Sequence, residues 1–484
     1  MNYDYLIVGG GPNGLTLAWY LSQYKYKVCL IEKEDNLGGC HSVKRQDGLF
    51  SEHGPRFYLG NYNTFQNLLR DMKLDFYDIF TPYKFYTAEI VSAIKIIFDK
   101  MSIREMFYLF VSFLNLNESQ RHVSFENYLK EYNFSQKSID FLNNLCKLTD
   151  GAGVDKYTLY NFLQIINQNI FYKIYQPKQP NDIGLFSLWK DKLIKNNVDI
   201  RLNTSAMDVE TENNKITSII CETKLATGKN NNNKTKIYGK NIIFALPPYT
   251  LANIMSKSSN SLFKNSFGNI NMFKTWTDET NYIIYIPMTF HWNKKIDIKE
   301  PWDYNLTDWN VAKITLSDYM NFNDKRSITV ISVCISNNAK SSFTKKTPNE
   351  TNDKEELIRE TFRQLKITYP NLPNPTYVVM ADNYHDGNKW VSNNTAFMTT
   401  VHGYIDPKSK NISNLYSCGM HNGKSEYGFT SLEGATVNAV GLVHDLVPTS
   451  KNEIKIETMI KVTSIIIIIL ILMIIFIVVL HYIQ

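Results

Sequence analysis

The stretch DYLIVGGGPNGLTLAWYLSQYKYKVCLIE, residues 4–32, decides the fold of this chain. An apolar strand runs into Gly9, Gly11 and Gly14 in the spacing G-x-G-x-x-G, and a helical pattern follows directly. In a β-α-β unit such glycines allow a tight turn, the approach of backbone to a pyrophosphate, and close packing of helix on strand. The stretch predicts a dinucleotide-binding α/β unit; a glycine-rich turn in another kind of α/β unit is the simpler alternative.

Glu32 supports the first interpretation. It closes the second strand, Lys27 to Ile31, eighteen residues after Gly14. A carboxylate at this place accepts hydrogen bonds from both hydroxyls of an adenosine ribose. An acid there favours a free ribose over a 2′-phosphate.

Length and composition predict a folded protein of about two domains, because 484 residues exceed the size at which one core keeps growing. The net charge of +6 arises from 52 basic and 46 acidic residues spread along the chain, which argues against nucleic acid as a partner. Six cysteines lie scattered without metal-ligand or disulfide spacing, so we expect reduced thiols and no metal site. The first residues enter a strand at once, and we expect no secretory signal.

The C-terminal stretch predicts a membrane anchor. Residues 465–480 are sixteen consecutive apolar residues, and 462–480 would span roughly 28 Å as a helix. A buried core helix is the alternative. Lys451, Lys455 and Lys461 precede this run, which favours a cytosolic location for residues 1 to about 447.

Two further glycine-rich segments follow the opening stretch. Gly38 and Gly39 would let backbone pass close to a cofactor, and Gly54-Pro55-Arg56 indicates a second tight approach. Arg56 is a candidate partner of a cofactor phosphate or of a flavin edge, with a solvated surface arginine as the alternative.

The middle of the chain alternates between helical and α/β patterns. Residues 63–169 read as helices, and their aromatic stripe at 107–113 indicates core, a hydrophobic substrate route or a surface that lies against a membrane. Strands are predicted at 198–202, 241–246, 281–292 and 327–335, helices at 188–195 and 354–366, and a solvated hairpin tip at 228–234.

The last module predicts a strand, a loop and a helix. The strand covers residues 415–418, and the helix begins near Ser431. Its small residues Gly434, Ala435 and Ala439 would let the helix approach something flat and wide, and its N-terminal amides can bind an electron-rich carbonyl edge.

These separated pieces together resemble the flavin-containing amine oxidase superfamily, which includes monoamine and polyamine oxidases, protoporphyrinogen oxidases and carotenoid desaturases. The resemblance is carried by GGGPNGL with Glu32, by GG at 38–39, SEHGPR at 51–56, GLFSL at 184–188, IIFALPP at 242–248 and the ending LYSCG…FTSLEGA. It implies an FAD-dependent oxidoreductase in which hydride passes from a substrate carbon to the flavin, with no dedicated acid–base pair.

The predicted fold is α/β: a Rossmann-like FAD-binding domain is interrupted by a mixed α+β substrate domain and followed by a transmembrane helix. The expected order is FAD-binding domain 1–62, helical substrate part 63–183, FAD-binding domain 184–250, substrate domain with a mixed sheet 251–390, FAD-binding domain 391–447, linker 448–461 and anchor 462–480. The predicted cofactor contacts are Gly9, Gly11, Gly14, Glu32, Gly38, Gly39, Arg56, Ala206, Gly419, Met420, Ser431 and Leu432.

The chain departs from this family at three positions. Cys40 stands where members often carry an arginine after the glycine pair, and Met420 stands where an acidic residue commonly binds the ribityl chain. Ser431 stands where the amine oxidases place an aromatic wall, which counts against a simple amine oxidase. The segment GPR at 54–56, the FTSLEGA ending and the predicted anchor tilt the prediction toward the protoporphyrinogen oxidase and desaturase branches, whose substrates are bulky and apolar. No cysteine lies shortly upstream of the final module, so FAD is expected to be non-covalent.

Two other functions remain open at this stage. A UDP-galactopyranose mutase-like isomerase would need basic residues in its pocket, for which Arg326 and Lys389 are isolated candidates. A flavin-free binding protein, similar to GDP-dissociation inhibitors, shares the fold. The histidines nearest the motifs are expected to be structural rather than catalytic, and they are His41, His53, His385 and His421.

Overall fold

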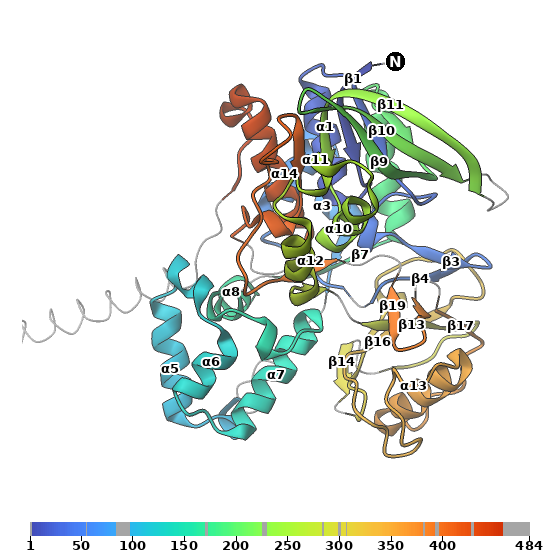
Figure 1. The fold of residues 1–484 in the computed structure, drawn as a ribbon. Helices are drawn as coiled ribbons and strands as arrows, with labels where there is room; N and C mark the ends of the chain where they lie inside the picture. Colours follow the sequence, from blue (N-terminus) through green and yellow to red (C-terminus); the bar gives the residue numbers. More distant parts are fainter. Residues whose placement is uncertain are drawn as a thin grey trace, which may run out of the picture.

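The computed structural model in Figure 1 describes residues 2–54, 56–83, 97–169, 173–224, 230–282, 285–298, 302–305, 307–380, 383–392, 396–426 and 430–457. Among these residues, no helix combines the length and apolar content that crossing a bilayer requires. The predicted anchor, 462–480, lies outside the described residues.

A seven-stranded sheet forms the centre of the molecule, in the order β8-β2-β1-β11-β10-β9, with β21 paired to β11. Its strands are β1 (Asn2–Val8), β2 (Val28–Ile31), β8 (Asp199–Arg201), β9 (Thr204–Glu212), β10 (Lys215–Lys224), β11 (Asn230–Phe244) and β21 (Leu415–Ser417). The pairs around β1 and the pair of β11 with β21 are parallel, whereas β9, β10 and β11 run antiparallel. Strands from three distant parts of the chain thus build one sheet, which confirms the predicted α/β core.

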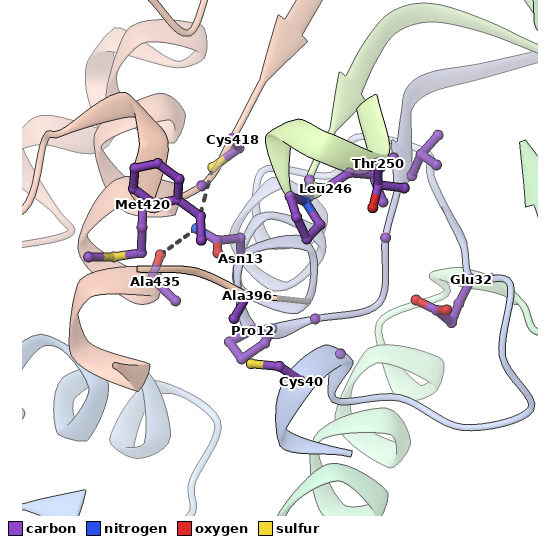
Figure 2. A pocket seen from close by; sticks show the side chains of 18 of the residues that line it. Pro12, Asn13, Glu32, Cys40, Leu246, Thr250, Ala396, Cys418, Met420 and Ala435 are labelled. Carbon is purple, nitrogen blue, oxygen red and sulfur yellow. Dashed lines mark hydrogen bonds between the residues drawn. The ribbon is translucent and has the colours of Figure 1, made fainter. Parts of the chain in front are cut away.

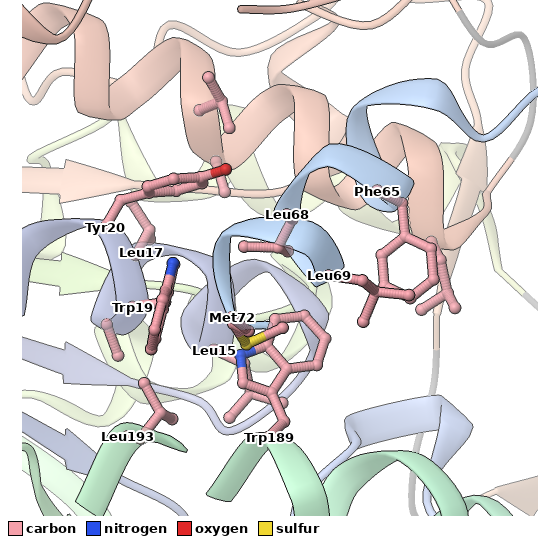
Figure 3. Packing of buried hydrophobic residues seen from close by; sticks show 14 of the residues in the cluster. Leu15, Leu17, Trp19, Tyr20, Phe65, Leu68, Leu69, Met72, Trp189 and Leu193 are labelled. Atoms are coloured by element: carbon pink, nitrogen blue, oxygen red, sulfur yellow. The ribbon is translucent and has the colours of Figure 1, made fainter. Parts of the chain in front are cut away.

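Helices cover both faces of this sheet, so β1 is buried on both sides. Tyr5 and Ile7 belong to one apolar cluster, and Leu6 and Val8 belong to the other, as the two-residue period of a strand requires. Figure 3 shows the first cluster, in which side chains of α1, α2 and α9 interdigitate. The helices of this face are α1 (Pro12–Gln23), α2 (Asn63–Asp71), α9 (Ser187–Lys195) and α14 (Leu432–Leu446), and those of the other are α10 (Pro248–Lys257), α11 (Ser261–Lys264) and α12 (Ile270–Glu279).

A helical lobe projects from one side of the core (Figure 1). It has its own apolar cluster, centred on buried Phe125, Phe162 and Leu163. The lobe contains α5 (Ile103–Leu114), η2 (Glu118–His122), α6 (Phe125–Glu131), α7 (Gln136–Asp150), η3 (Val154–Lys156) and α8 (Leu159–Asn169).

A second sheet lies on the other side, in the order β14-β15-β16-β13-β17, and α13 (Lys354–Thr368) packs against it. Its strands are β13 (Ile286–Trp292), β14 (Trp302–Asn305), β15 (Val311–Thr315), β16 (Thr329–Ile335) and β17 (Tyr377–Val379). This sheet is the additional substrate domain that the sequence predicts.

Short elements connect these layers. The strands are β3 (Lys44–Gln46), β4 (Leu49–Ser51), β5 (Tyr58–Leu59), β6 (Phe80–Pro82), β7 (Ile174–Pro177), β12 (Asn281–Tyr282), β18 (Asn383–His385), β19 (Trp390–Ser392) and β20 (Phe397–Thr399). The helical turns are η1 (Gly39–His41), α3 (Phe76–Ile79), η4 (Asp182–Phe186), η5 (Leu316–Asp318), η6 (Met420–Asn422) and η7 (Pro448–Asn452).

Two strand predictions need correction. The strand expected at 241–246 is the end of the longer β11, which begins at Asn230, so residues 230–234 belong to the ladder rather than to a hairpin tip. The strand expected at 281–292 divides into β12 and β13, which lie in different sheets. Both errors arise because apolar alternation does not reveal where pairing partners change.

Candidate functional site

A cavity of about 320 Å³ opens where the carboxyl ends of β1, β2, β11 and β21 meet the N-terminal ends of α1 and α14. Parallel strands present their carboxyl ends at one edge of a sheet, and ligands of open α/β sheets bind in the crevice outside that edge. Figure 2 shows the cavity between α1, the turn at Cys40 and the start of α14.

The three motif glycines have different geometric roles. Gly9 has φ +112°, and a Cβ there would lie 2.4 Å from the Ala245 carbonyl oxygen. A Cβ at Gly14 would lie 1.9 Å from the Gly9 carbonyl oxygen, so this glycine permits close packing of helix on turn. At Gly11 a Cβ would meet only the Gly39 Cα atom, at 3.7 Å. Gly11 therefore leaves open the space in front of the N-terminus of α1.

Glu32 lies at the end of β2 and lines the end of the cavity opposite Met420 (Figure 2). Its Oε2 accepts a hydrogen bond from the Gly10 amide at 2.6 Å, and its Oε1 accepts one from the Glu34 amide at 3.0 Å. The side chain is 8% exposed, and burial raises its pKa. Each carboxylate oxygen keeps a further acceptor position, so Glu32 can still bind hydroxyl groups.

Two helix N-termini face the cavity together, and Asn13 joins them. Its Nδ2 donates to the Ala435 carbonyl oxygen at 2.9 Å and contacts Cys418 Sγ at 3.7 Å (Figure 2). The first turn of α1 carries no acidic residue and no side-chain cap. Free amides and the helix dipole make such a terminus attractive to anions. Sequence reasoning missed Asn13, because the motif leaves its position unspecified.

The first turn of α14 directs its acid away from the cavity. Ser431 caps the helix by accepting a hydrogen bond from the Gly434 amide at 2.9 Å. The Glu433 carboxylate accepts from the amides of Thr64 and Phe65, at 3.0 and 2.8 Å, and so caps α2. Burial raises the pKa of Glu433 to about 7 even though both amides favour the ionised form.

The cavity wall near α14 is mostly apolar or neutral. It contains Leu246, Ala396 and Phe397 together with two histidines, His41 and His421. Burial lowers the pKa of His421 to about 3 and that of His41 well below its ordinary value, so both rings are neutral. These histidines therefore add no positive charge to the wall.

Met420 fills the place where the resemblance implies an acid. Its sulfur lies against Gly434, where a Cβ would come within 2.5 Å of Sδ. Asn438 Nδ2 donates to the same sulfur at 3.6 Å and to the Gly434 carbonyl oxygen at 2.8 Å. The expected close approach at Gly434 is thus made by Met420.

The structure places eight of the twelve predicted cofactor contacts on the cavity wall, namely Gly9, Gly11, Glu32, Gly39, Ala206, Gly419, Met420 and Ser431. Gly14 and Leu432 are buried in packing behind the wall. A Cβ at Gly38 would lie 2.6 Å from the Phe186 ring, which explains the match of GLFSL.

Arg56 does not line the cavity. Its guanidinium donates to the Cys40 carbonyl oxygen, and its Nε lies 3.9 Å from Glu52 Oε2. A buried cation requires such partners. Burial raises the pKa of Glu52 to about 7, and the charge of Arg56 opposes that rise. Arg56 therefore supports the turn at Cys40 from behind.

The residues present are suited to a dinucleotide. A free helix N-terminus in front of Gly11 suits a pyrophosphate, Glu32 suits a ribose, and the second helix N-terminus on the same cavity suits the carbonyl edge of a ring. The described residues contain no cluster of His, Cys, Asp and Glu that could hold a metal ion.

Comparisons with known proteins agree with this geometry. Residues 7–72 match the family model of the NAD(P)-binding Rossmann-like domain, and residues 187–440 match that of the flavin containing amine oxidoreductases. A 71-residue stretch is 34% identical to UDP-galactopyranose mutase of Mycoplasma genitalium, covering 14% of this chain and 18% of that protein. A 56-residue stretch is 43% identical to carotenoid 3,4-desaturase of Haloarcula japonica, covering 12% of this chain and 11% of that protein. The chain thus matches less than a fifth of either relative's length.

Solved structures share the whole fold at low identity. Putrescine oxidase superposes with a TM-score of 0.59 at 12% identity, over 93% of this chain and 99% of that one. An oxidoreductase from Methanosarcina mazei superposes with a TM-score of 0.55 at 13% identity, over 91% of this chain and 99% of that one. The family model of the flavin containing amine oxidoreductases covers more than half of this chain. The chain therefore belongs to the flavin-containing amine oxidoreductase family and is an FAD-dependent oxidoreductase.

Proposed function

We propose that this protein holds FAD non-covalently in the described cavity and dehydrogenates an amine or a bulky apolar molecule while attached to a membrane. The observation that carries the proposal is the pair of helix N-termini, α1 and α14, which Asn13 ties together on one cavity. When bound, FAD supplies the hydride acceptor.

The chain's own residues would bind and orient the cofactor. Gly9, Gly11 and the amides of α1 would hold the pyrophosphate, Glu32 the adenosine ribose, and backbone at Ala206 the adenine. The amides at the start of α14 would face the flavin. They would stabilise negative charge on its carbonyl edge, since a helix N-terminus is electropositive.

The apolar character of the wall near α14 supports the bulky apolar class of substrate. Glu32 is the one carboxylate among the described residues that line the cavity, and it lies at the adenosine end. A protonated amine would therefore find no counter-charge at the described part of the other end. Leu246 and Phe397 there would exclude water and pack on a large apolar molecule.

Spectroscopy of the purified full chain tests the cofactor assignment. The protein should be yellow, and acid precipitation should release all of the flavin into the supernatant, because no covalent bond holds it. A colourless protein that FAD does not protect against heating would refute the proposal and favour a flavin-free binding protein.

Anaerobic mixing tests the substrate class. The flavin-loaded protein is combined with polyenes, porphyrinogens, monoamines and polyamines, and bleaching of the flavin band is followed. We expect bleaching by a polyene or a porphyrinogen and slower or no bleaching by polyamines. Bleaching by polyamines alone would overturn the preference for apolar substrates.

The similarity to UDP-galactopyranose mutase favours one second candidate, an isomerase that works with reduced flavin. The basic residues considered for it do not line the cavity: Arg326 pairs with Asp324 and donates to the Asp47 carbonyl oxygen, and Lys389 lies in the exposed turn at Asp386. Turnover of a UDP-sugar only after reduction of the flavin would establish this activity.

Membrane attachment through residues 462–480 is the remaining part of the proposal. The apolar run at 465–480 and the lysines at 451, 455 and 461 support it and favour a cytosolic location for the described residues. In cells, the protein should remain in the pellet after alkaline carbonate extraction, and protease added from the cytosolic side should digest residues 1–457. Extraction into the supernatant would contradict the anchor.

A further inference from the structure

The outer face of α5 exposes a stripe of large apolar side chains. Ile103 is 79% exposed, Phe107 60%, Phe110 44% and Val111 45%. The spacing of four and then three or four residues places them on one side of the helix. Phe98, on the preceding segment, is also exposed, at 63%. Single exposed apolar residues are ordinary on protein surfaces, but a contiguous group marks an interaction site.

Polar contacts on the inner face fix the direction of this stripe. Glu105 is 2% exposed, and its carboxylate accepts from the Ser102 amide at 2.7 Å, the Ser135 amide at 2.5 Å and the Ser138 hydroxyl at 2.9 Å. These bonds join the start of α5 to the start of α7 and lower the pKa of Glu105 to about 2. The helix cannot rotate its apolar side inward without breaking them.

Further along α5, the same inward face is held by hydroxyl and amide groups. The Ser112 hydroxyl lies 2.9 Å from the Tyr128 hydroxyl, which also donates to the Tyr108 carbonyl oxygen at 2.9 Å. Gln120 Nε2 donates to the Ser112 carbonyl oxygen at 3.0 Å. The inward side of α5 thus combines these polar contacts with apolar packing of Phe113, Met106 and Leu109 in the lobe's cluster, and the exposed stripe is a second apolar face of the same helix.

α5 carries few charges, and none of them belongs to the stripe. Its two ionic side chains are Glu105, which is buried, and Arg104, whose guanidinium donates to the Asn133 carbonyl oxygen at 2.6 Å. The stripe residues themselves are uncharged, and such a face is suited to hydrocarbon rather than to an oppositely charged protein.

We propose that the exposed stripe of α5 inserts into the interfacial region of the membrane to which the chain is attached. The inference rests on the membrane attachment proposed above: residues 458–484 follow the described chain and include the apolar run 465–480. Figure 1 shows α5 on the outer side of the helical lobe, where no described element covers it. The stripe would give the protein a second contact with lipid and fix the orientation of the lobe on the bilayer.

Fluorescence of the full chain tests this contact. An environment-sensitive fluorophore is attached to Phe107→Cys, and in a matched control to Ile367→Cys on α13, since Ile367 is 59% exposed and lies on the opposite lobe. Both side chains are exposed, so thermal unfolding of both variants should equal that of the wild type. In vesicles of phosphatidylcholine alone, the label at 107 should brighten several-fold, and nitroxides in the acyl chains should quench it. The label at 367 should not change.

The outcomes separate the two proposals. If the protein floats with vesicles but the label at 107 stays as aqueous as that at 367, the attachment stands and the α5 inference is wrong. If the protein does not float, both are wrong. Shielding at 107 that lipid nitroxides do not quench would show that a second copy or residues 458–484 cover the stripe, which also overturns the inference. Because the stripe carries no charge, quenching should be equal at about 0.1 M and about 1 M salt.

Discussion

At the end of the cavity that Glu32 closes, the wall includes the motif glycines Gly9 and Gly11, whereas near Met420 it includes larger residues such as Leu246 and Phe397. At the first end Gly9 and Gly14 have a geometric requirement, such as the 1.9 Å that would separate a Cβ at Gly14 from the Gly9 carbonyl oxygen, whereas Gly11 leaves space open. At the second end, Cys40, Phe397 and Met420 meet no comparable backbone constraint. Backbone geometry therefore constrains the residues proposed to bind the cofactor more strongly than it constrains those proposed to contact the substrate.

Replacing Gly14 with alanine should give the largest effect. The added methyl group would overlap the Gly9 carbonyl oxygen, and since that atom is backbone the β1–α1 turn must move. We expect Gly14→Ala to lower the unfolding free energy by about 3 kcal/mol or more. Denaturant unfolding of the flavin-free protein measures the change.

Gly11→Ala is the matched control for this experiment. Its methyl group would meet only the Gly39 Cα atom at 3.7 Å, so stability of the flavin-free protein should change by less than about 0.5 kcal/mol. The methyl group would nevertheless occupy the space in front of α1, and FAD retention on a desalting column should fall sharply. Equal stability of the two variants would refute the different roles assigned to these glycines.

Replacing Glu433 with glutamine should give the next largest effect, which is a change in how the unfolding free energy depends on pH. Its pKa is raised to about 7 in the folded protein from an ordinary value of 4.5. The folded state therefore binds this proton more tightly, and the associated stability, present below pH 4.5, is lost as pH rises to about 7. Between these two pH values, the unfolding free energy of Glu433→Gln should rise by on the order of 3 kcal/mol relative to that of the wild type. A difference in stability that does not depend on pH leaves this change unaffected.

Thermal unfolding of wild type and Glu433→Gln at several pH values checks this prediction. The Glu360→Gln variant is a suitable control, because burial is outweighed by hydrogen bonds and Arg363, which lower the pKa of Glu360. Its contribution to stability is present above pH 4.5 and is lost only as pH falls, so the pH dependence should have the opposite sign. A constant difference between wild type and Glu433→Gln across the range would mean that the two amides of α2 keep Glu433 ionised.

The sequence predicts the parts of the fold that depend on backbone geometry better than the contacts that depend on distant side chains. The α/β core and the presence of an additional sheet were predictable, because glycine spacing and apolar alternation reflect backbone geometry directly. Local sequence could not show that Arg56, a predicted cofactor partner, contacts the Cys40 carbonyl oxygen and Glu52. Asn13 and the capping of α2 by Glu433 were missed, because each bond joins residues more than 360 positions apart.

Within the adenosine end, Glu32→Gln should weaken FAD binding more than it changes the fold. An amide presents one acceptor instead of two, so the side chain can no longer serve the Gly10 and Glu34 amides and a ribose together. We expect the FAD dissociation constant to rise by about 10-fold to 100-fold, the equivalent of losing hydrogen bonds to a charged group. Fluorescence titration of the flavin-free protein measures it.

The control for Glu32 is Glu34→Gln, two residues away. Glu34 pairs with Lys44 at 3.4 Å and does not line the cavity. Its substitution should leave FAD affinity within about twofold of wild type, because partly exposed ion pairs contribute little. Equal losses in both variants would point to a general electrostatic effect instead of a ribose contact.

Met420→Leu at the flavin-facing end should have the smallest effect. Leucine fills a similar volume against Gly434 and gives up only the weak contact of sulfur with Asn438 Nδ2, whose stronger bond to the Gly434 carbonyl oxygen remains. Stability should change by less than about 1 kcal/mol, with FAD retention unchanged. Substrate bleaching rates are the sensitive measurement here, since Met420 lines the cavity. Loss of FAD from this variant would show that the sulfur itself binds the cofactor, and the flavin-facing end would then be as strictly determined as the end at Glu32.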